Sequence, residues 1–238
     1  MKRGSLPPVG GYVLAGGKSS RMGSDKALLE LAGKPLVIHA VTKLQRLCAE
    51  VSVLSSNPEL ARFGPLVRDL HEGCGPLGGI EAALRSSKYD WNLILPVDLP
   101  FLPTFHLDDW LWSVLHEPIR DIKLSMLSVD ATPHPALLII HRELAPYLTV
   151  SLERGELKLL PALRAASEGI AAKLKTKRKK VFVEMQWDDP YAPAAKSRTE
   201  AWRSATDAQR KNCSLWFANL NTPEEFAKAK QHVDALDT

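Results

Sequence analysis

The chain has 238 residues, of which 45% are hydrophobic and 24% are charged, and its formal net charge at pH 7 is +4. This composition excludes an intrinsically disordered chain and is enough to bury one sizeable core. No apolar run approaches the roughly 18 residues of a membrane-spanning helix, and the N-terminal segment lacks the pattern of a cleaved leader. We therefore expect a single domain over residues 1–238, located in the cytoplasm and without membrane association.

The cysteines and the basic residues exclude two further classes of protein. Cys48, Cys74 and Cys213 are widely spaced and form no C-x-x-C pair, so they indicate reduced thiols rather than a zinc site or a redox couple. Basic residues occupy six of the eight positions 173–180. Because no aromatic residues are interleaved with them and no recognition motif accompanies them, we interpret this run as a solvated loop or an anion-binding edge. We expect no nucleic-acid partner.

The first half of the chain alternates strands and helices in the order of a parallel α/β sheet. Strands are expected at 11–15, 51–55, 65–69 and 91–97, and helices at 35–48 and 80–87. The segment 91–97, "WNLILPV", is the strongest strand pattern in the chain. A continuous apolar run of this length is typical of a strand that is buried on both faces, so it should be central in the sheet.

After Pro103 the pattern is mixed rather than regularly alternating. A helix is expected at 105–116, a helical stretch at 142–166, and strands at 122–129, 135–141, 181–187 and 215–221. Residues 188–211 are polar with little periodicity and are interpreted as a surface excursion of low order. A last helix should begin at Thr222, because Pro223 and Glu225 complete a capping box with proline at the first helical position.

A glycine-rich, basic loop, "LAGGKSSRMGSDK", follows the first strand at 14–26. It leaves the carboxyl end of the strand, where open α/β sheets bind ligands. Gly16 and Gly17 let the backbone amides approach an anion closely. Positive charge is added by Lys18, Arg21 and Lys26. We therefore interpret the loop as a polyphosphate site rather than as a tight turn with solvent-facing charges.

Two better-known glycine motifs compete for this part of the chain. A Walker P-loop needs four residues between its outer glycines, whereas five separate Gly11 from Gly17. The segment "GCGPLG" at 73–78 is a literal G-x-G-x-x-G and is followed by Asp98 twenty residues after Gly78. That spacing matches a dinucleotide fingerprint, although the strand before it is short and polar. An NAD(P)-dependent oxidoreductase is therefore the rival enzyme class.

Asp98 directly follows the strand expected at 91–97. A carboxylate at the carboxyl edge of a central strand is well placed to hold Mg²⁺. An aspartate that only caps or turns the chain is the alternative, but the position of the strand favours the metal site. Asp69 also follows a strand-like run and can join the same edge.

Together these segments resemble one family, the molybdenum cofactor guanylyltransferases, which attach a nucleotide to molybdopterin. The resemblance rests on "LAGGKSSRMGSDKALL" (14–29) with "GKPL" (33–36), "GPLGGI" (75–80), "LPVDLPFLP" (95–103) and "FANLNTPEEF" (217–226). It implies an α/β fold with a Rossmann-like, mostly parallel sheet flanked by helices on both faces, of the nucleotide-diphospho-sugar transferase type, with a mixed C-terminal portion. Residues 1–103 would then form the nucleotide-binding half, and 104–238 the acceptor-binding half with the excursion at 188–211.

The resemblance also implies roles for individual residues. The implied nucleotide-binding residues are Leu14, Ala15, Gly16, Gly17, Lys26, Asp69, Gly78 and Asp98. The implied catalytic residues are Arg21, Lys26 and Asp98, with Asp98 as the ligand of Mg²⁺. The implied acceptor or product contacts are His134, Asn219 and Asn221. Where family members often carry an asparagine after the second strand, this chain has Leu54, and Asn57 is the nearest substitute.

The reaction expected from the resemblance is the transfer of GMP from GTP to molybdopterin, or the molybdenum cofactor, with release of pyrophosphate. A cytidylyl- or sugar-nucleotidyltransferase of the same fold is the alternative. A non-catalytic chaperone that binds the molybdenum cofactor is a further one. The implied partners are GTP, molybdopterin, and the molybdoenzymes or their chaperones that receive the product.

Overall fold

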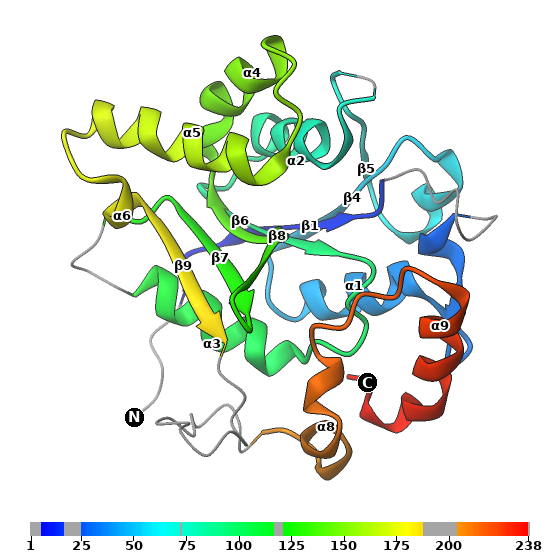
Figure 1. Ribbon diagram of the computed structural model, residues 1–238. Coiled ribbons are helices and arrows are strands. Elements are labelled where there is room, and N and C mark those ends of the chain that lie inside the picture. Colours follow the sequence, from blue (N-terminus) through cyan, green and yellow to red (C-terminus); the bar gives the residue numbers. More distant parts are fainter. Residues whose placement is uncertain (1–5, 17–24, 72, 117–120, 188–203, 238) are drawn as a thin grey trace.

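The computed structural model describes residues 6–16, 25–71, 73–116, 121–187 and 204–237. A seven-stranded sheet with the order β5-β4-β1-β6-β8-β7-β9 forms its centre, and helices cover both faces (Figure 1). The strands are β1 (Val9–Leu14), β4 (Glu50–Leu54), β5 (Leu66–Val67), β6 (Trp91–Pro96), β7 (Leu124–Val129), β8 (Thr132–His141) and β9 (Phe182–Trp187). A separate small ribbon pairs β2 (Glu30–Leu31) with β3 (Lys34–Pro35).

The sheet has a parallel half and a mixed half, as the sequence predicted. β1 runs parallel to β4 and β6, and β4 runs parallel to β5. β8 runs antiparallel to β6 and β7, and β9 is parallel to β7. From β1 the chain continues to β4 and β5 on one side and then crosses to β6 on the other. In an open α/β sheet this reversal marks the crevice in which ligands bind, outside the carboxyl ends of β1 and β6.

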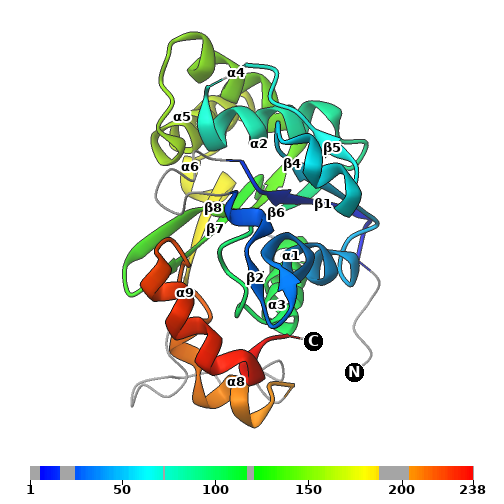
Figure 2. The same ribbon diagram turned by 90° about the vertical axis from the view of Figure 1, so that its right-hand side faces the viewer.

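Two layers of helices cover the sheet (Figure 1, Figure 2). One layer contains α2 (Gly75–Ser86), α4 (Ala145–Glu153) and α5 (Leu159–Lys173), and the other contains α1 (Leu36–Gln45), α3 (Thr104–Leu115), α8 (Asp207–Lys211) and α9 (Pro223–Ala229). Tyr12 and Leu14 of β1 pack into the core under the first layer, and Val13 packs into the core under the second. This alternation follows from the two-residue period of a strand. β1 is therefore buried on both faces.

The remaining elements are short. They are α6 (Arg178–Val181) and the 3₁₀ helices η1 (Lys26–Leu28), η2 (Pro58–Phe63), η3 (Arg142–Leu144), η4 (Cys213–Leu215) and η5 (Lys230–Ala235). In the part of the chain that the structure describes, no helix has the length and apolar character needed to cross a membrane.

Three predictions about the second half need correction. The helical stretch expected at 142–166 is helical, but its continuity and its end are wrong: α4 and α5 are separate helices, α5 ends at Lys173, and Gly155 has a φ of +70° just after α4. Such a left-handed glycine is a common helix stop. The strand expected at 215–221 is also wrong, because Trp216, Phe217 and Leu220 are buried in the core instead of pairing with a strand. Burial can override strand propensity in this way.

The excursion expected at 188–211 is partly helical. Residues 188–203 lie outside the described residues, but α8 begins within the segment. Thr206 caps this helix and forms a capping box with Gln209. The T-x-x-Q pattern is a sequence signal for such a start, and the prediction overlooked it. The box at Thr222 and Glu225, which was predicted, is confirmed.

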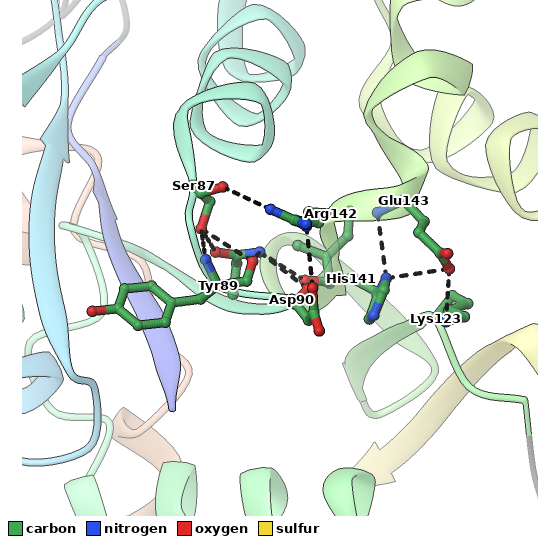
Figure 3. Close-up of polar contacts among 9 residues, drawn as sticks. Ser87, Tyr89, Asp90, Lys123, His141, Arg142 and Glu143 are labelled. Carbon is green, nitrogen blue, oxygen red and sulfur yellow. Dashed lines mark hydrogen bonds and ion pairs between the residues drawn. The ribbon is translucent and has the colours of Figure 1, made fainter. Parts of the chain in front are cut away.

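A polar network closes the amino end of β6, at the edge of the sheet opposite to Asp98 (Figure 3). Arg142 Nε lies 3.1 Å from Asp90 Oδ1, and Ser87 Oγ donates to Asn92 Oδ1 at 2.6 Å. The Asn92 side chain is fully buried. Because buried polar groups need partners, the network satisfies Asn92 and ties α2 to β6 and β8. We assign it a structural role.

Candidate active site

Three segments that are far apart in the sequence, η1, the loop after β6 and the segment before α9, meet at one place. Lys26 Nζ, in η1, donates to Asp98 Oδ2 at 2.9 Å. The same ammonium donates to Asn221 Oδ1 at 2.6 Å, across 195 positions of the chain. The structure therefore brings together three of the residues implied by the resemblance, Lys26, Asp98 and Asn221, around one positive charge.

Lys26 is placed by a cap at the start of its helix. Asp25 Oδ1 accepts a hydrogen bond from the backbone N–H of Ala27 at 3.0 Å, which caps η1. The second carboxylate oxygen, Asp25 Oδ2, accepts a hydrogen bond from Asn57 Nδ2 at 2.6 Å. Because Asn57 follows β4, this contact ties Asp25, and with it the start of η1, to the end of a neighbouring strand. Asn57 thus supports the start of η1. Leu54, which stands where family members often carry an asparagine, is buried in the core.

Asp98 is held through its backbone, and one of its carboxylate oxygens is orphaned. The Leu220 N–H donates to the Asp98 carbonyl at 3.1 Å, and the Val97 N–H donates to the Leu14 carbonyl at 3.2 Å. Asp98 Oδ1 is buried and has no hydrogen-bond partner among the described residues. A buried carboxylate oxygen without a partner is costly, so this atom is suited to a cation.

The residues present fit Mg²⁺ better than a metal held by protein side chains alone. Among the described residues, no three His, Cys, Asp or Glu side chains gather as a metal-binding group. Mg²⁺ is usually bound by one or two carboxylates, with substrate phosphates and water as its other ligands. A single carboxylate beside a cationic side chain matches that pattern.

Asp69 lies against the start of α2, where two glycines leave room for it. A Cβ placed on Gly79 would lie 3.2 Å from Asp69 Oδ1, and one placed on Gly78 would lie 3.4 Å from Asp69 Oδ2. The same Cβ on Gly79 would lie 3.6 Å from Leu14 Cδ1. Burial raises the pKa of the Asp69 carboxyl group above its ordinary value. The structure thus brings Leu14, Asp69 and Gly78 to one place beside the end of β1.

Gly16 is not required by its own packing. Among the described residues, a Cβ on Gly16 would meet only the Leu54 carbonyl oxygen, at an ordinary 3.7 Å, and Gly16 has no left-handed φ. A glycine that neither turn geometry nor packing explains is expected where a ligand approaches the backbone closely. Ala15, its neighbour, donates from its N–H to Leu54 O at 3.2 Å, so the end of the strand is fixed. Gly17, Lys18 and Arg21 lie outside the described residues.

The residues expected to contact the acceptor differ in their surroundings. Among the described rings, His134 on β8 and Phe217 have centroids 5.6 Å apart. Burial lowers the pKa of His134, while the Asp98 carboxylate acts in the opposite direction, which places the imidazole within its field. Asn219 is exposed, two residues before Asn221. The structure therefore places His134 near Asp98, and its role toward the acceptor stays a prediction.

His106 was missed by the sequence reasoning. Its ring lies edge-on to Trp187, with centroids 4.4 Å apart, and 5.6 Å from the ring of Phe217. Burial lowers the pKa of His106 to about 4, so the ring is neutral near pH 7. A lone histidine in an amphipathic helix pattern gave no signal for this cluster, because its partners come from β9 and from the segment after η4.

The topology removes the dinucleotide interpretation of "GCGPLG". In that fold the acidic residue ends the strand beside the one that carries the glycine loop. Here the glycines follow β5 at the edge of the sheet, and Asp98 follows β6, which β4 and β1 separate from β5. Asp98 therefore cannot serve the glycines at 73–78 in the manner of a dinucleotide site. The loop after the central strand β1 is the nucleotide candidate.

Residues 11–169 match the protein family described as the MobA-like NTP transferase domain. The chain belongs to this family. The matched region runs from β1 into α5 and includes Lys26, Asp69 and Asp98, whereas Asn221 lies beyond it. The chain is therefore a nucleotidyltransferase, and an oxidoreductase built on residues 66–98 is excluded.

Individual relatives agree with the family match. A molybdenum cofactor guanylyltransferase from Serratia proteamaculans is 36% identical over 165 residues, which cover 66% of this chain and 80% of that protein. A protein of the same name from Vibrio atlanticus is 32% identical over 153 residues, covering 62% and 76% of the two chains. Each of these two alignments covers more than two thirds of the relative's length, so the similarity extends beyond one motif.

Solved structures show the same fold. Molybdopterin-guanine dinucleotide biosynthesis protein A from Archaeoglobus fulgidus superposes with a TM-score of 0.67 at 20% identity, covering 96% of this chain and 100% of that one. CMP:2-keto-3-deoxy-manno-octonic acid synthetase, complexed with CTP, superposes with a TM-score of 0.55 at 13% identity, covering 94% and 97%. Sequence identities this low establish only a shared fold. The fold class predicted from the sequence is thereby confirmed.

The capping box of α9, formed by Thr222 and Glu225, holds the backbone at Asn221. Glu225 Oε2 accepts hydrogen bonds from the N–H groups of Asn221 at 2.6 Å and Thr222 at 2.9 Å. Thr222→Ala should lower the free energy of unfolding by about 1 kcal/mol, measured by urea denaturation. Ser214→Ala, at an exposed position nearby, is the control and should change nothing. An unchanged unfolding midpoint in Thr222→Ala would contradict the role of the box.

Proposed function

We propose that this protein transfers GMP from GTP to molybdopterin, forming the guanine dinucleotide of the cofactor and pyrophosphate. The observation that carries the proposal is the meeting of Lys26, Asp98 and Asn221 at the carboxyl ends of β1 and β6. Relatives named molybdenum cofactor guanylyltransferase, at up to 36% identity among those described above, support the choice of substrates. The cytoplasm is the expected location.

The protein's part in such a transfer is positioning and charge compensation. The terminal phosphate of molybdopterin attacks the α-phosphorus of GTP, and the bond from that phosphorus to the bridging oxygen of the leaving pyrophosphate breaks. A phosphate monoester is largely ionised near pH 7, so no general base is needed. Lys26, together with Arg21 from the loop after β1, would offset the charge on the departing pyrophosphate.

Asp98 is the proposed ligand of Mg²⁺, through the buried oxygen Oδ1 that lacks a partner among the described residues. When bound, the cation would neutralise charge on the phosphate oxygens of GTP. Lys26 then has a second task, because it compensates the Asp98 carboxylate when no cation is present. His134, Asn219 and Asn221 are proposed to face the acceptor or the product.

Isotope labelling tests this proposal. The protein is incubated with Mg²⁺, molybdopterin and GTP that carries the label on the α-phosphorus or, in a parallel sample, on the γ-phosphorus. We expect the α-label to appear in a molybdopterin product and the γ-label in pyrophosphate. Both labels remaining in GTP would contradict the proposal, and a transfer that requires CTP instead would favour the cytidylyl alternative.

Asp69 is proposed to contact the guanine nucleotide, and its removal should separate binding from stability. Asp69→Asn should weaken GTP binding by about 10-fold, the effect of losing one hydrogen bond to a charged group. Because burial raises the pKa of Asp69, the ionised carboxylate destabilises the fold above that pKa, and the neutral amide removes this cost. Thermal unfolding at pH 7 should therefore be unchanged or shifted upward.

Titration calorimetry with GTP measures the binding effect of Asp69→Asn. Asp130→Asn, in the exposed turn between β7 and β8, is a matched control, since asparagine tolerates its φ of +48°. Equal GTP affinity in both variants would remove Asp69 from the nucleotide site.

A further inference from the structure

The loop between β6 and α3 depends on a side chain from another helix. The loop carries Asp98 and includes Pro100 and Pro103, which have no backbone N–H to donate. Lys43 of α1 reaches its carbonyl groups: Nζ lies 3.5 Å from Leu99 O and also donates to Pro100 O. These carbonyls follow Asp98 directly in the chain. Lys43 therefore supports the backbone that presents the carboxylate.

The burial of Lys43 is costly, so its presence needs a reason. Only 1% of Lys43 is exposed, and it is among the largest fully buried side chains of the protein. Burial lowers the pKa of Lys43 to about 8, and the Asp237 carboxylate partly opposes this while Arg46 adds to it. Lysine is rarely buried without a specific partner, and an apolar residue could fill the space at less cost. In this buried place the ammonium of Lys43 finds two hydrogen-bond acceptors, the carbonyls of Leu99 and Pro100.

The ends of the same loop are fixed by other groups. At the start, Leu220 N–H donates to the Asp98 carbonyl at 3.1 Å. At the end, Asp237 Oδ2 accepts from the Thr104 N–H at 2.7 Å and from its hydroxyl. Lys43 supports the stretch between these two anchors. Of the three supports, it is the one that meets the backbone immediately after Asp98.

We propose that Lys43 is a positioning residue for the cation site: by holding the carbonyls of Leu99 and Pro100 it fixes the Asp98 carboxylate in the place where it binds the metal. This rests on the proposed function, which assigns the cation to Asp98. Lys43 donates to two backbone carbonyls, so its proposed part is positioning and not ligation of the cation. Its loss should therefore weaken binding of the cation without weakening binding of GTP.

The test measures Mn²⁺ binding directly, by the paramagnetic resonance signal of the free ion, with GTP present and molybdopterin absent. Lys43→Met keeps the length of the side chain but removes its donors, and should weaken Mn²⁺ binding by about 10-fold. Steady-state kinetics with molybdopterin should show a lower kcat with little change in the KM for GTP. Lys43→Gln serves as a second variant in case the methionine variant does not fold.

Val41→Ala is the matched control, because Val41 is a buried apolar residue of the same helix that has no polar side-chain group. It destabilises the core without removing a donor and should bind Mn²⁺ as the unmodified protein does. Unchanged Mn²⁺ binding in the Lys43 variants, or an equal loss in Val41→Ala, would overturn the proposal. Unchanged Mn²⁺ binding in Asp98→Asn would overturn the assignment of the cation to Asp98. The Asp98 variant therefore tests the proposed function separately from the proposed role of Lys43.

Discussion

Asp98→Asn should lower kcat by about 10²-fold or more, since preorganised charge at a reacting phosphate contributes on that scale. The substitution keeps the shape of the side chain and the backbone contact to Leu220, so the fold should survive. It removes the charge of the carboxylate whose buried oxygen is proposed to bind the cation. Pyrophosphate release at saturating GTP and Mg²⁺ measures the effect, and circular dichroism checks the fold.

The control for Asp98→Asn lies at the other end of the same strand. Asp90 precedes β6 and pairs with Arg142 in the network of Figure 3. Asp90→Asn should leave kcat unchanged, because the network lies at the opposite end of β6 from Asp98 and an exposed ion pair contributes little. If Asp98→Asn turned over as fast as Asp90→Asn, the cation site would have been misplaced.

Lys26→Met should lower kcat/KM for GTP by about 10²-fold, because one charged donor is removed from the phosphates and from the leaving group. Its methylene chain is retained, so packing around η1 should change little. In the protein without ligand, the substitution leaves the partly buried Asp98 carboxylate and the Asn221 amide without the ammonium between them. The midpoint of thermal unfolding should therefore fall slightly.

Lys88→Met is the charge-matched control for Lys26→Met. Lys88 is exposed and pairs with Glu50 at the opposite edge of the sheet, so its loss changes the net charge by the same amount. Its kcat/KM should equal that of the unmodified protein. Lys26→Arg is expected to recover activity only in part, because a planar guanidinium does not reproduce the point charge of an ammonium. A Lys26→Met protein with normal kcat/KM would contradict the role of Lys26 at the phosphates.

The parallel half of the fold could be predicted because its signals are local. The strands β1 and β6 are continuous apolar runs, and the carboxyl ends of parallel strands meet at one edge of the sheet. That reasoning was enough to expect Lys26 and Asp98 at the same edge of the sheet, and the structure places their side chains in contact. The short β5 was also expected, although the helix after it begins earlier, at Gly75.

The second half was less predictable because its packing is not local. Residues 215–221 have strand-like composition, yet they bury Trp216 and Phe217 against the α3 face of the sheet. Sequence alone does not show that the chain returns 195 positions later to place Asn221 on Lys26. Only the resemblance to a family had suggested Asn221.

The supports of the site were the hardest part to predict. The Asn57 amide that holds Asp25, and the Lys43 ammonium that holds the loop after Asp98, are both polar residues in ordinary surroundings in the sequence. In α1, Lys43 lies three residues after Ala40 and seven after Leu36, on the buried face of the helix, but a single charged residue at that place gave no signal that its whole side chain is buried. Its burial depends on the loop and on Asp237, which come from distant parts of the chain.

The most direct test of the central claim compares the four nucleoside triphosphates as donors. The protein is incubated with Mg²⁺ and each triphosphate, with and without molybdopterin, and pyrophosphate release is followed. We predict release that requires molybdopterin and is fastest with GTP, together with a guanine dinucleotide product. Release that is independent of molybdopterin, or a preference for another triphosphate, would contradict guanylyl transfer to this acceptor.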